Sequence, residues 1–409
     1  MTLTATSTIT PEQALASLLA PISPVDHEQV PLSMATGRVL AKALIADRPS
    51  PAIDVSAMDG FAMRLADISM TAIPIAGELS AGQPPMSLSP HTCLRIATGA
   101  AIPVDADFVV PREHVTESKH SIAVHPDRVA MIRVGAHIRR EGENASIGAY
   151  ILQPGAAIHA PAAAALATFG VCDPAVFRRV RISVIVTGDE VNDDRGPSEP
   201  PISPQIKPWL VRDSNGPAMT ALFASFAWAD VQSVSHVRDD LIALCTALQD
   251  ATTTSDMVIL TGGVAVGHKD FVPAVLDAIG ARTLFHGVAQ KPGRPFLGAF
   301  AGNCPVLCLP GNPVSVMITA RRYAIPVARA LAGFSIREAP AESVRLIASI
   351  EKPSALTRFI AVRHIEPGFV RALEMRGSGD CVGLGPSNGF VEIPANQTGI
   401  GPWNFFNWN

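Results

Sequence analysis

Residues 257–270 read Met-Val-Ile-Leu-Thr-Gly-Gly-Val-Ala-Val-Gly-His-Lys-Asp, and this stretch decides how the central part of the chain folds. A short apolar run that ends in a glycine cluster and leads into a helical pattern predicts a strand, a loop and a helix. Such a loop turns backbone N–H groups toward one point, and the positive end of the following helix lies beside them. The stretch therefore predicts an anion-binding loop, with phosphate as the first ligand to expect.

The sequence on either side repeats this alternation of strand and helix. Apolar runs predict strands over residues 180–186, 231–237, 257–260 and 306–309. Helical patterns follow Asp213 and cover residues 239–248, 271–279 and 314–331. This order predicts a mostly parallel sheet that binds ligands at the carboxyl ends of its strands. Residues 193–208 contain five prolines and predict a long surface loop.

The flanking segments have different patterns. Thr10, Pro11 and Gln13 form a capping-box signature, which predicts a helix start. A second helix is expected over residues 30–45 despite Gly37, and an Ala-rich one over residues 161–169. Between them, short apolar runs alternate with Gly, Pro and Asp, and the same pattern returns after residue 344. Both regions are therefore predicted to be rich in β-strands.

A chain of 409 residues is too long for one ordinary core. The expected fold class is multidomain, with a central α/β domain of mostly parallel sheet and additional all-β parts. We expect a discontinuous helical or mixed domain I, an inserted β-rich domain II, an α/β domain III and a small, β-barrel-like domain IV. Their predicted bounds are 1–48 with 138–178, 49–137, 179–335 and 336–409, respectively.

Composition narrows the functional classes. Hydrophobic residues make up 48% and charged residues 17%, as in a globular protein. The net charge of −4 and the lack of a Lys/Arg run argue against nucleic acid as a partner. We expect a cytoplasmic protein without membrane association, since no signal peptide is apparent and no apolar segment is long enough to span a bilayer. The six scattered cysteines predict reduced, mostly buried thiols rather than disulfides or a zinc site.

Carboxylates gather where the predicted strands end. Asp189 and Glu190 follow the strand over residues 180–186, and Asp213 and Asp270 stand next to neighbouring elements. Each of them alone could equally cap a helix. Together with a phosphate loop they favour a metal or ligand role, because carboxylates in such places hold Mg²⁺, which bridges to phosphate oxygens.

Two further turns carry groups suited to anions. In Lys291-Pro-Gly-Arg294-Pro, the prolines hold two cations on a stiff turn, so less entropy is lost when they bind an oxyanion. In Leu309-Pro-Gly-Asn-Pro-Val-Ser315, a strand meets a helix whose first turn offers a hydroxyl. The alternatives are an exposed turn with solvated charges and a plain connection. Together the loops favour a multiply anionic ligand.

Other candidates are less specific. Asp59 precedes Gly60, a pair that usually marks only a turn. His268 is either a general base or, as we favour, an exposed loop histidine without a partner that can be named. The chain contains no Gly-x-Ser-x-Gly elbow, Walker loop or HExxH motif.

The motifs as a set resemble the molybdopterin molybdenumtransferases, the MoeA family, which includes the E domain of gephyrin. Nine motifs occur in family order along nearly the whole chain, and the order is more specific than any one of them. They begin at Asp54, Arg95, Ile138, Thr187, Asp213, Gly262, Lys291, Pro310 and Gly377.

The resemblance implies an elongated four-part subunit that forms a homodimer. It implies the reaction of adenylylated molybdopterin with molybdate to give the molybdenum cofactor and AMP, with Mg²⁺ or a similar divalent ion. Other cofactor-synthesis proteins and a recipient molybdoenzyme are possible partners. The catalytic residues carried over are Asp59, Glu190, Asp213, Asp270 and Lys291, with Glu190 and Asp213 as metal ligands. The binding residues carried over are Asp189, Thr261, Gly262, Gly263, Arg294, Ser315 and Ser378, of which Gly262 and Gly263 would lie against the pterin phosphate.

The chain departs from the family pattern at five positions. Asn144 stands where the family usually has Asp, Thr261 and Ala265 where it has Ser, and Arg294 where it has Lys. A family Arg falls at Ala361, for which Arg358 or Arg363 could substitute. These changes keep open a non-catalytic protein that binds or carries molybdopterin or the finished cofactor. A scaffold is a third class, for which no receptor-binding groove is visible in the sequence.

Overall fold

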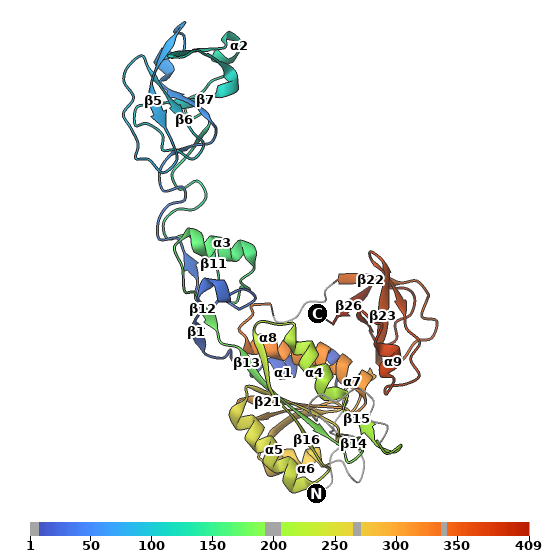
Figure 1. Cartoon of the computed structure of the whole chain (residues 1–409). Helices are drawn as coiled ribbons and strands as arrows, with labels where there is room; N and C mark the ends of the chain where they lie inside the picture. The colour runs from blue at the N-terminus through green and yellow to red at the C-terminus, as the bar shows by residue number, and fades with distance from the viewer. Residues whose placement is uncertain (1–7, 193–205, 265–270, 337–341, 409) are drawn as a thin grey trace. The chain divides into compact units, whose positions relative to one another are not determined.

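The computed structural model describes residues 8–192, 206–264, 271–336 and 342–408 (Figure 1). The chain forms two compact units. The first unit comprises Met1–Lys42, Pro154–Ala164 and Val171–Asn409, and the second comprises Ala43–Gln153 and Ala165–Gly170. The four domain bounds expected from the sequence are a finer division and stay a prediction.

A six-stranded sheet forms the centre of the first unit, in the order β16–β13–β17–β21–β20–β18. The four strands from β16 to β21 are parallel, and the hairpin of β20 and β21 and the pairing of β18 are antiparallel. The mostly parallel sheet expected from the sequence is thus confirmed. The strands are β13 (Val180–Thr187), β16 (Ala229–Val237), β17 (Met257–Thr261), β18 (Arg282–His286), β20 (Leu297–Ala301) and β21 (Cys304–Leu309).

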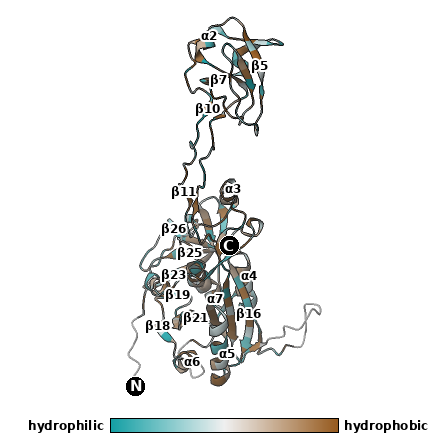
Figure 2. Ribbon diagram, turned by 90° about the vertical axis from the view of Figure 1, so that its left-hand side faces the viewer, coloured by the Kyte–Doolittle hydropathy of each residue, from teal (hydrophilic) through white to brown (hydrophobic). Residues whose placement is uncertain are grey.

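Helices cover both faces of this sheet (Figure 1). Strand β13 is buried on both sides, with Val184 in one hydrophobic cluster and its neighbour Ile185 in the other. Hydrophobic colouring accordingly runs along the sheet strands (Figure 2). One face is covered by α5 (Leu241–Thr254) and α6 (Val272–Ala278), and the other by α1 (Pro11–Leu19), α4 (Asn215–Ala224), α7 (Pro313–Thr319) and α8 (Ile325–Leu331).

The helix expected over residues 314–331 is present but is not uniform. Asn312 precedes α7 in an extended conformation, and Pro313 occupies the first turn, where its missing N–H costs nothing. Between α7 and α8 the backbone widens to a π-helix over Ala320–Ala324. The three segments form one continuous, largely buried rod.

The C-terminal strands close into a small barrel. Their order is β23–β24–β22–β26–β25, and β25 pairs back with β23, which confirms the barrel-like domain. One apolar cluster fills the barrel and a second, with Phe359 and Phe390, packs against α7. The elements are β22 (Glu342–Leu346), β23 (Thr357–Glu366), β24 (Phe369–Ala372), β25 (Gly389–Ile393), β26 (Trp403–Asn407) and the short α9 (Cys381–Leu384). The two-residue strand β19 (Gln290–Lys291) adds to β23 in parallel.

The N-terminal helix is confirmed, with Thr10 and Gln13 forming the expected capping box. The helix expected over residues 30–45 is wrong. That segment contains a 3-10 turn, Leu32–Met34, and its amides bond to distant carbonyls: Gly37 to Ile158 at 2.8 Å and Leu40 to Ala156 at 2.9 Å. Gly37 has a φ of +77°, which ends any helix there.

Short strands flank this segment: β1 (His27–Gln29) pairs with β12 (Ala175–Phe177), and β2 (Leu44–Ile45) with β11 (Tyr150–Leu152). The Ala-rich pattern is confirmed as α3 (Ala160–Thr168).

The second unit contains a six-stranded sheet in the order β7–β4–β6–β5–β9–β8. Its apolar core includes Phe61, Ile73, Phe108 and Ile122, so the β-rich reading of this region is confirmed. The sheet strands are β4 (Gly60–Met63), β5 (Ile73–Leu79), β6 (Cys93–Ile96), β7 (Phe108–Pro111), β8 (Val115–Glu117) and β9 (Ser121–Val124). A separate antiparallel pair is formed by β3 (Val55–Ser56) and β10 (Ile138–Arg139). Short helical turns lie at Leu65–Asp67, Arg112–His114 and Pro126–Val129.

All six cysteines are free thiols. Only three are buried, Cys93, Cys304 and Cys308, and the expectation of mostly buried thiols is therefore half right. Burial raises the pKa of the Cys304 thiol to about 12, which leaves it a poor metal ligand at neutral pH. Among the described residues, no helix is long and apolar enough to cross a membrane.

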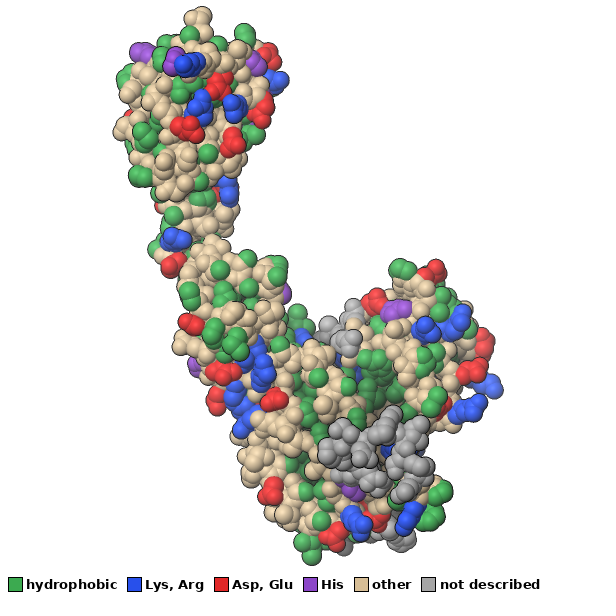
Figure 3. Space-filling view, in the orientation of Figure 1, with side chains coloured by type: hydrophobic (Ala, Val, Ile, Leu, Met, Phe, Trp, Pro, Cys, Tyr) green, Lys and Arg blue, Asp and Glu red, His purple; other side chains and the backbone are tan. Residues whose placement is uncertain are grey.

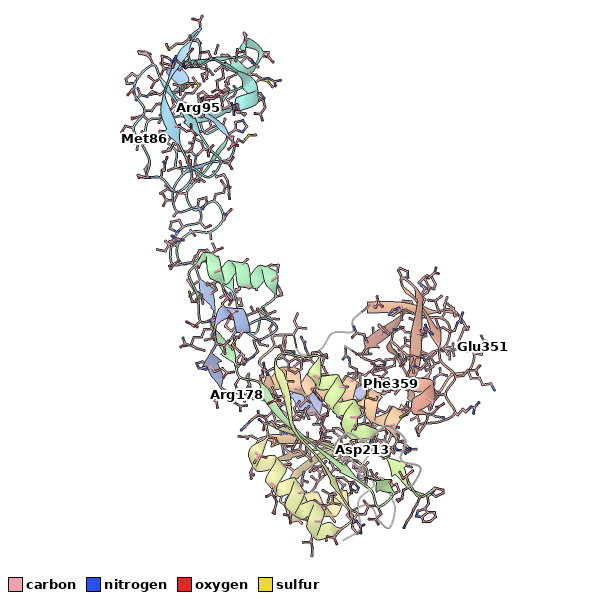
Figure 4. All side chains as sticks on the ribbon, viewed as in Figure 1. Met86, Arg95, Arg178, Asp213, Glu351 and Phe359 are labelled. Carbon is pink, nitrogen blue, oxygen red and sulfur yellow. The ribbon has the colours of Figure 1, made fainter. Side chains whose placement is uncertain are left out.

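An ion cluster ties the start of β13 to the start of β17. Asp256 accepts hydrogen bonds from Arg178 at 2.5 and 2.8 Å and from the side chain and backbone N–H of Arg181; Figure 4 labels Arg178. Burial acts to raise the pKa of Asp256, but the two guanidinium groups outweigh it and lower this pKa to about 2. Because Asp256 is nearly buried, with 9% of its side chain exposed, the cluster contributes to stability.

We predict that Asp256→Asn lowers the free energy of unfolding at pH 7 by roughly 2 kcal/mol, from the lowered pKa. The folded pKa lies below the unfolded value of 3.8. The stabilisation is therefore complete above about pH 4 and is lost as the pH falls toward 2. Thermal unfolding of the wild type and of Asp256→Asn between pH 7 and pH 2 checks this prediction. Asp250→Asn, at an exposed site on α5, is the control, and a wild-type advantage that persists at pH 2 would contradict the assignment.

Candidate functional site

The carboxyl ends of three parallel strands meet at one edge of the central sheet. Val186 aligns with Thr261 across β13 and β17, and Thr261 aligns with Leu309 across β17 and β21. The loops that follow these strands begin side by side. The motifs at Thr187, Gly262 and Pro310 therefore lie together, as the sequence predicted for a parallel sheet.

Gly262 and Gly263 make the close approach of these loops possible. Their φ angles are +99° and +63°, which side chains rarely tolerate. A Cβ on Gly262 would come within 2.5 Å of the Thr187 carbonyl oxygen. The Gly262 N–H donates to the Leu309 carbonyl at 3.1 Å. Both glycines are thus required by the backbone of this edge.

Asn215 links three of the motifs, although no role for it is predicted from the sequence. Its Nδ2 donates to the Gly311 carbonyl at 2.9 Å and approaches the Thr261 hydroxyl at 3.4 Å. The side chain is buried, and its Oδ1 has no hydrogen-bond partner among the described residues. The only signal in the sequence was its place in the Asp213-Ser-Asn motif, two residues after a candidate ligand; an amide can donate and accept several hydrogen bonds.

Two of the candidate acidic residues, Glu190 and Asp213, lie between β13 and α4. Asp213 lies at the start of α4 (Figure 4), and its Oδ1 accepts from the Gly216 N–H at 2.9 Å. Asp213 therefore caps the helix with one oxygen, as the alternative reading expected. Glu190 is exposed, and its carboxylate folds back over Gly188, where a Cβ would be 2.7 Å away.

A short parallel pair connects these two acids. Strand β14 (Val191–Asn192) follows Glu190, and β15 (Val211–Arg212) precedes Asp213. Asp189 lies in the same loop, and its Oδ1 accepts from the Asp239 N–H at 3.4 Å.

Among the described residues, no three His, Cys, Asp or Glu side chains form a group that could hold a metal ion. Two of the predicted residues, Glu190 and Asp213, nevertheless belong to adjoining segments at the carboxyl edge of the sheet. Asp270, Ala265 and His268 lie outside the described residues.

The C-terminal domain contributes Ser378 to the start of α7. The Ser378 carbonyl accepts from the Val314 N–H at 3.0 Å, and its hydroxyl accepts from Asn312 Nδ2 at 2.9 Å. Residues 66 positions apart are thus joined at the Pro-Gly-Asn-Pro turn. The structure places Ser378 beside the loop predicted to bind an anion.

Lys291 stands next to a second cation. It aligns with Arg358 across the parallel pair of β19 and β23. Arg358 donates to the Gln397 carbonyl at 3.1 Å, and its Nε is buried without a partner among the described residues. Ala361, by contrast, lies in the apolar cluster with Phe359. Of the two proposed substitutes for the family arginine, Arg358 is therefore the one placed beside Lys291.

The turn from Lys291 to Arg294 lies against α7. A Cβ on Gly293 would come within 2.6 Å of the Thr319 hydroxyl. Ser315 precedes Thr319 by four residues and therefore lies on the same face of α7, one turn closer to its start. Ser315 is buried, whereas Lys291 and Arg294 are exposed. The cationic turn and Ser315 thus share one side of the helix.

A cavity of about 330 Å³ lies between α4, α7 and α9. Its lining is mainly apolar, and the residues include Ser214, Pro313, Met317, Leu384, Ser387 and Trp408. Ser214 adjoins Asp213, and Pro313 adjoins Asn312, so the cavity borders two of the motifs. Its size is typical of small-molecule sites.

Three motifs converge inside the second unit. Asp59 accepts from the Thr98 N–H at 2.7 Å and its hydroxyl at 2.8 Å, and these bonds lower the pKa of Asp59. Asp54 pairs with Arg140 at 2.5 Å. Asn144 accepts from Arg139 at 2.7 Å.

Gly60, the partner of Asp59 in its motif, has no space for a Cβ, which would meet the Val110 carbonyl at 2.1 Å. The Asp59–Gly60 pair is therefore more than a turn marker, and the loss of a carboxylate at Asn144 leaves its local hydrogen bond intact.

On the face drawn in Figure 3, acidic and basic side chains are interspersed over the C-terminal barrel. The absence of a nucleic-acid partner stays a prediction from the sequence.

Two family models match separate parts of this chain. Residues 9–170 match the MoeA N-terminal region (domain I and II), and residues 183–330 match the Probable molybdopterin binding domain. A molybdopterin molybdenumtransferase of Synechococcus elongatus is 32% identical over 397 residues, which cover 94% of this chain and 95% of that protein. One of Bacillus subtilis is 30% identical, with 91% and 87% covered.

The fold also matches a solved structure. The molybdopterin biosynthesis MoeA protein of Pyrococcus horikosii superposes with a TM-score of 0.80 at 23% identity, covering 98% of this chain and all of that one. The fold is therefore that of the MoeA proteins. With the sequence matches, this chain belongs to the molybdopterin molybdenumtransferase family.

We predict that Gly262→Ala destabilises the sheet edge more than Gly302→Ala does. Both glycines have positive φ angles, +99° and +58°, but only at Gly262 would the new methyl group meet backbone within 3 Å. Thermal unfolding should show a midpoint roughly 5 °C lower for Gly262→Ala than for the Gly302→Ala control, because of the added steric cost. Equal unfolding midpoints would contradict the prediction and show that the loop can shift to accommodate the methyl group.

Proposed function

We propose that this protein is an enzyme that inserts molybdate into adenylylated molybdopterin and releases AMP, the step that forms the molybdenum cofactor. The observation that carries the proposal is the meeting of the Gly262, Pro310 and Asp213 motifs, joined through Asn215, at one sheet edge. Both reactants are anions, and glycine loops and helix starts of the kind that meet at this edge are common anion-binding elements. The names of the relatives support the same reaction.

Each element of the site has a role in this proposal. The loop of Gly262 and Gly263 would take the pterin phosphate, and the cavity beside Ser214 would accommodate the organic part of the substrate. Lys291, Arg294 and Ser315, with Ser378 from the barrel, would hold molybdate. Positioned charges and N–H donors can supply most of the catalysis in phosphoryl chemistry, so no protein nucleophile is required.

In this proposal, Glu190 and Asp213 bind a divalent ion such as Mg²⁺. These carboxylates fit such an ion, because Mg²⁺ is usually held by one or two carboxylates together with substrate phosphates rather than by a protein cage. When bound, the ion would neutralise charge on the phosphate oxygens. Family membership supports three further parts of the proposal. These are a catalytic role for Asp59, a homodimer, and transfer of the product to a recipient molybdoenzyme.

One assay tests the whole proposal. Purified protein is mixed with adenylylated molybdopterin, Mg²⁺ and molybdate, and AMP is followed over time. AMP release that depends on molybdate supports the enzyme. Tight binding of the pterin without turnover would instead support the carrier protein that Asn144 and Ala265 left open.

We predict that Glu190→Gln lowers turnover at least ~10²-fold while pterin binding persists, because the lost charge misplaces the ion. Glu351→Gln, at an exposed site in the C-terminal part, is the matched control and should retain full activity. Turnover and pterin binding are measured separately, with Mg²⁺ titrated. Unchanged turnover would remove Glu190 from the mechanism.

We predict that Lys291→Ala raises the molybdate concentration needed for half-maximal rate by roughly 10-fold, since a hydrogen bond to a charged group contributes about 1.5–3 kcal/mol. Lys352→Ala removes an exposed lysine elsewhere and serves as the control. Initial rates of AMP release against molybdate concentration provide the measurement. A change confined to the affinity for the pterin would show that Lys291 has a different role.

A further inference from the structure

The cationic turn from Lys291 to Arg294 stands on a buried polar base. Both cations are exposed, but Gln290 directly before them has none of its surface exposed, and neither do Thr319 and Tyr323. Burying polar side chains is unfavourable unless they make specific bonds. Gln290 and Tyr323 make such bonds, whereas the Thr319 hydroxyl has no hydrogen-bond partner among the described residues. The bonds of Gln290 and Tyr323 under a turn with two exposed cations therefore call for a reason.

Gln290 connects the turn to the helix rod. Its Nε2 donates to the Gly293 carbonyl at 3.2 Å, across the turn. Its Oε1 accepts from the Tyr323 hydroxyl. Gly293 has a φ of +89°, and a Cβ there would lie 2.7 Å from Gln290 Nε2. The amide of Gln290 therefore holds the turn from inside, and Tyr323 holds that amide.

Tyr323 reaches Gln290 from within the π-helix. Within Ala320–Ala324, three successive buried side chains contact different partners. Arg321 donates to the Asn407 carbonyl at 2.5 Å, Arg322 pairs with Glu392 at 3.0 Å, and Tyr323 contacts Gln290. The wider backbone turn permits this arrangement, and π-turns inside helices often occur at functional sites.

Packing leaves Tyr323 little freedom. Its ring lies 4.8 Å from that of Phe296, and the Arg322 guanidinium lies 5.5 Å from the Tyr323 ring centroid. A rigid ring is a precise support for a hydrogen bond. A turn held in this way loses less conformational entropy when its cations bind an oxyanion.

We infer that Gln290 and Tyr323 are positioning residues that hold the Lys291–Arg294 turn in the conformation that binds molybdate. The inference rests on the proposed function and adds to it two residues that no motif singled out. They do not touch the substrate; they act through Lys291 and Arg294. Their removal should therefore affect molybdate affinity, and leave both pterin affinity and the rate at saturating molybdate nearly unchanged.

Tyr323→Phe tests the inference, because it removes one hydroxyl and keeps the ring. The expected result is a rise of about 10-fold in the molybdate KM, with kcat and the pterin KM within about twofold of wild type. Ser255→Ala is the matched control, since it removes another buried hydroxyl, bonded to Ser183 at 2.6 Å at the opposite side of the sheet. Ser255→Ala should leave the molybdate KM unchanged even if it lowers the unfolding midpoint as much as Tyr323→Phe does.

A second variant separates positioning from general loosening. Gln290→Met conserves volume and removes both bonds, so it should raise the molybdate KM at least as much as Tyr323→Phe. If the two residues act as a unit, the double variant should match Gln290→Met alone. Calorimetric titration of each variant with molybdate compares their molybdate affinities directly, without turnover.

The outcomes are distinct. Wild-type protein that releases no AMP in response to molybdate would refute the proposed function. Wild-type activity with an unchanged molybdate KM in both Tyr323→Phe and Gln290→Met would overturn the positioning role alone. Additive effects in the double variant would likewise overturn the role of the pair as one support.

Discussion

The arrangement of the whole site depends on how closely the backbone of Gly262 approaches two neighbouring strands. Gly262 donates to the Leu309 carbonyl and passes so close to the Thr187 carbonyl that a side chain has no space. This contact sets the spacing of the three loops at the sheet edge. Asn215 then bridges two of them with its amide. The edge requires glycine at this position because its φ is positive and the neighbouring carbonyl leaves no space for a Cβ.

The rod formed by α7, the π-helix and α8 connects this sheet edge to the C-terminal barrel. At its start, Asn312 and Val314 bond to Ser378. Further along, Arg322 forms a buried pair with Glu392, whose pKa is raised by burial although Arg322 acts to lower it. Such a pair contributes little to net stability, but breaking it leaves an unpaired buried charge. The pair therefore acts mainly to define where the barrel packs on the rod.

The substitutions relative to the family pattern have different consequences. Asn144 accepts a hydrogen bond from Arg139, although the carboxylate charge of the family residue is lost. Ala361 is part of the barrel packing, and Arg358 lies beside Lys291, which adds a third cation to Lys291 and Arg294. The names of the relatives favour an enzyme over the carrier class.

The sequence by itself determined the alternation of strands and helices around Gly262, the capping box at Thr10 and the set of anion-binding motifs. These signals are local: they depend on apolar periodicity, turn residues and caps within a few positions. The same local reasoning failed over residues 30–45, where amides bond to carbonyls more than a hundred positions away. Tertiary structure alone decided that Asn215 joins three motifs, that Arg358 lies beside Lys291 and that Tyr323 supports Gln290. Each of these contacts joins residues distant in sequence, and no local pattern specifies which buried polar groups satisfy one another.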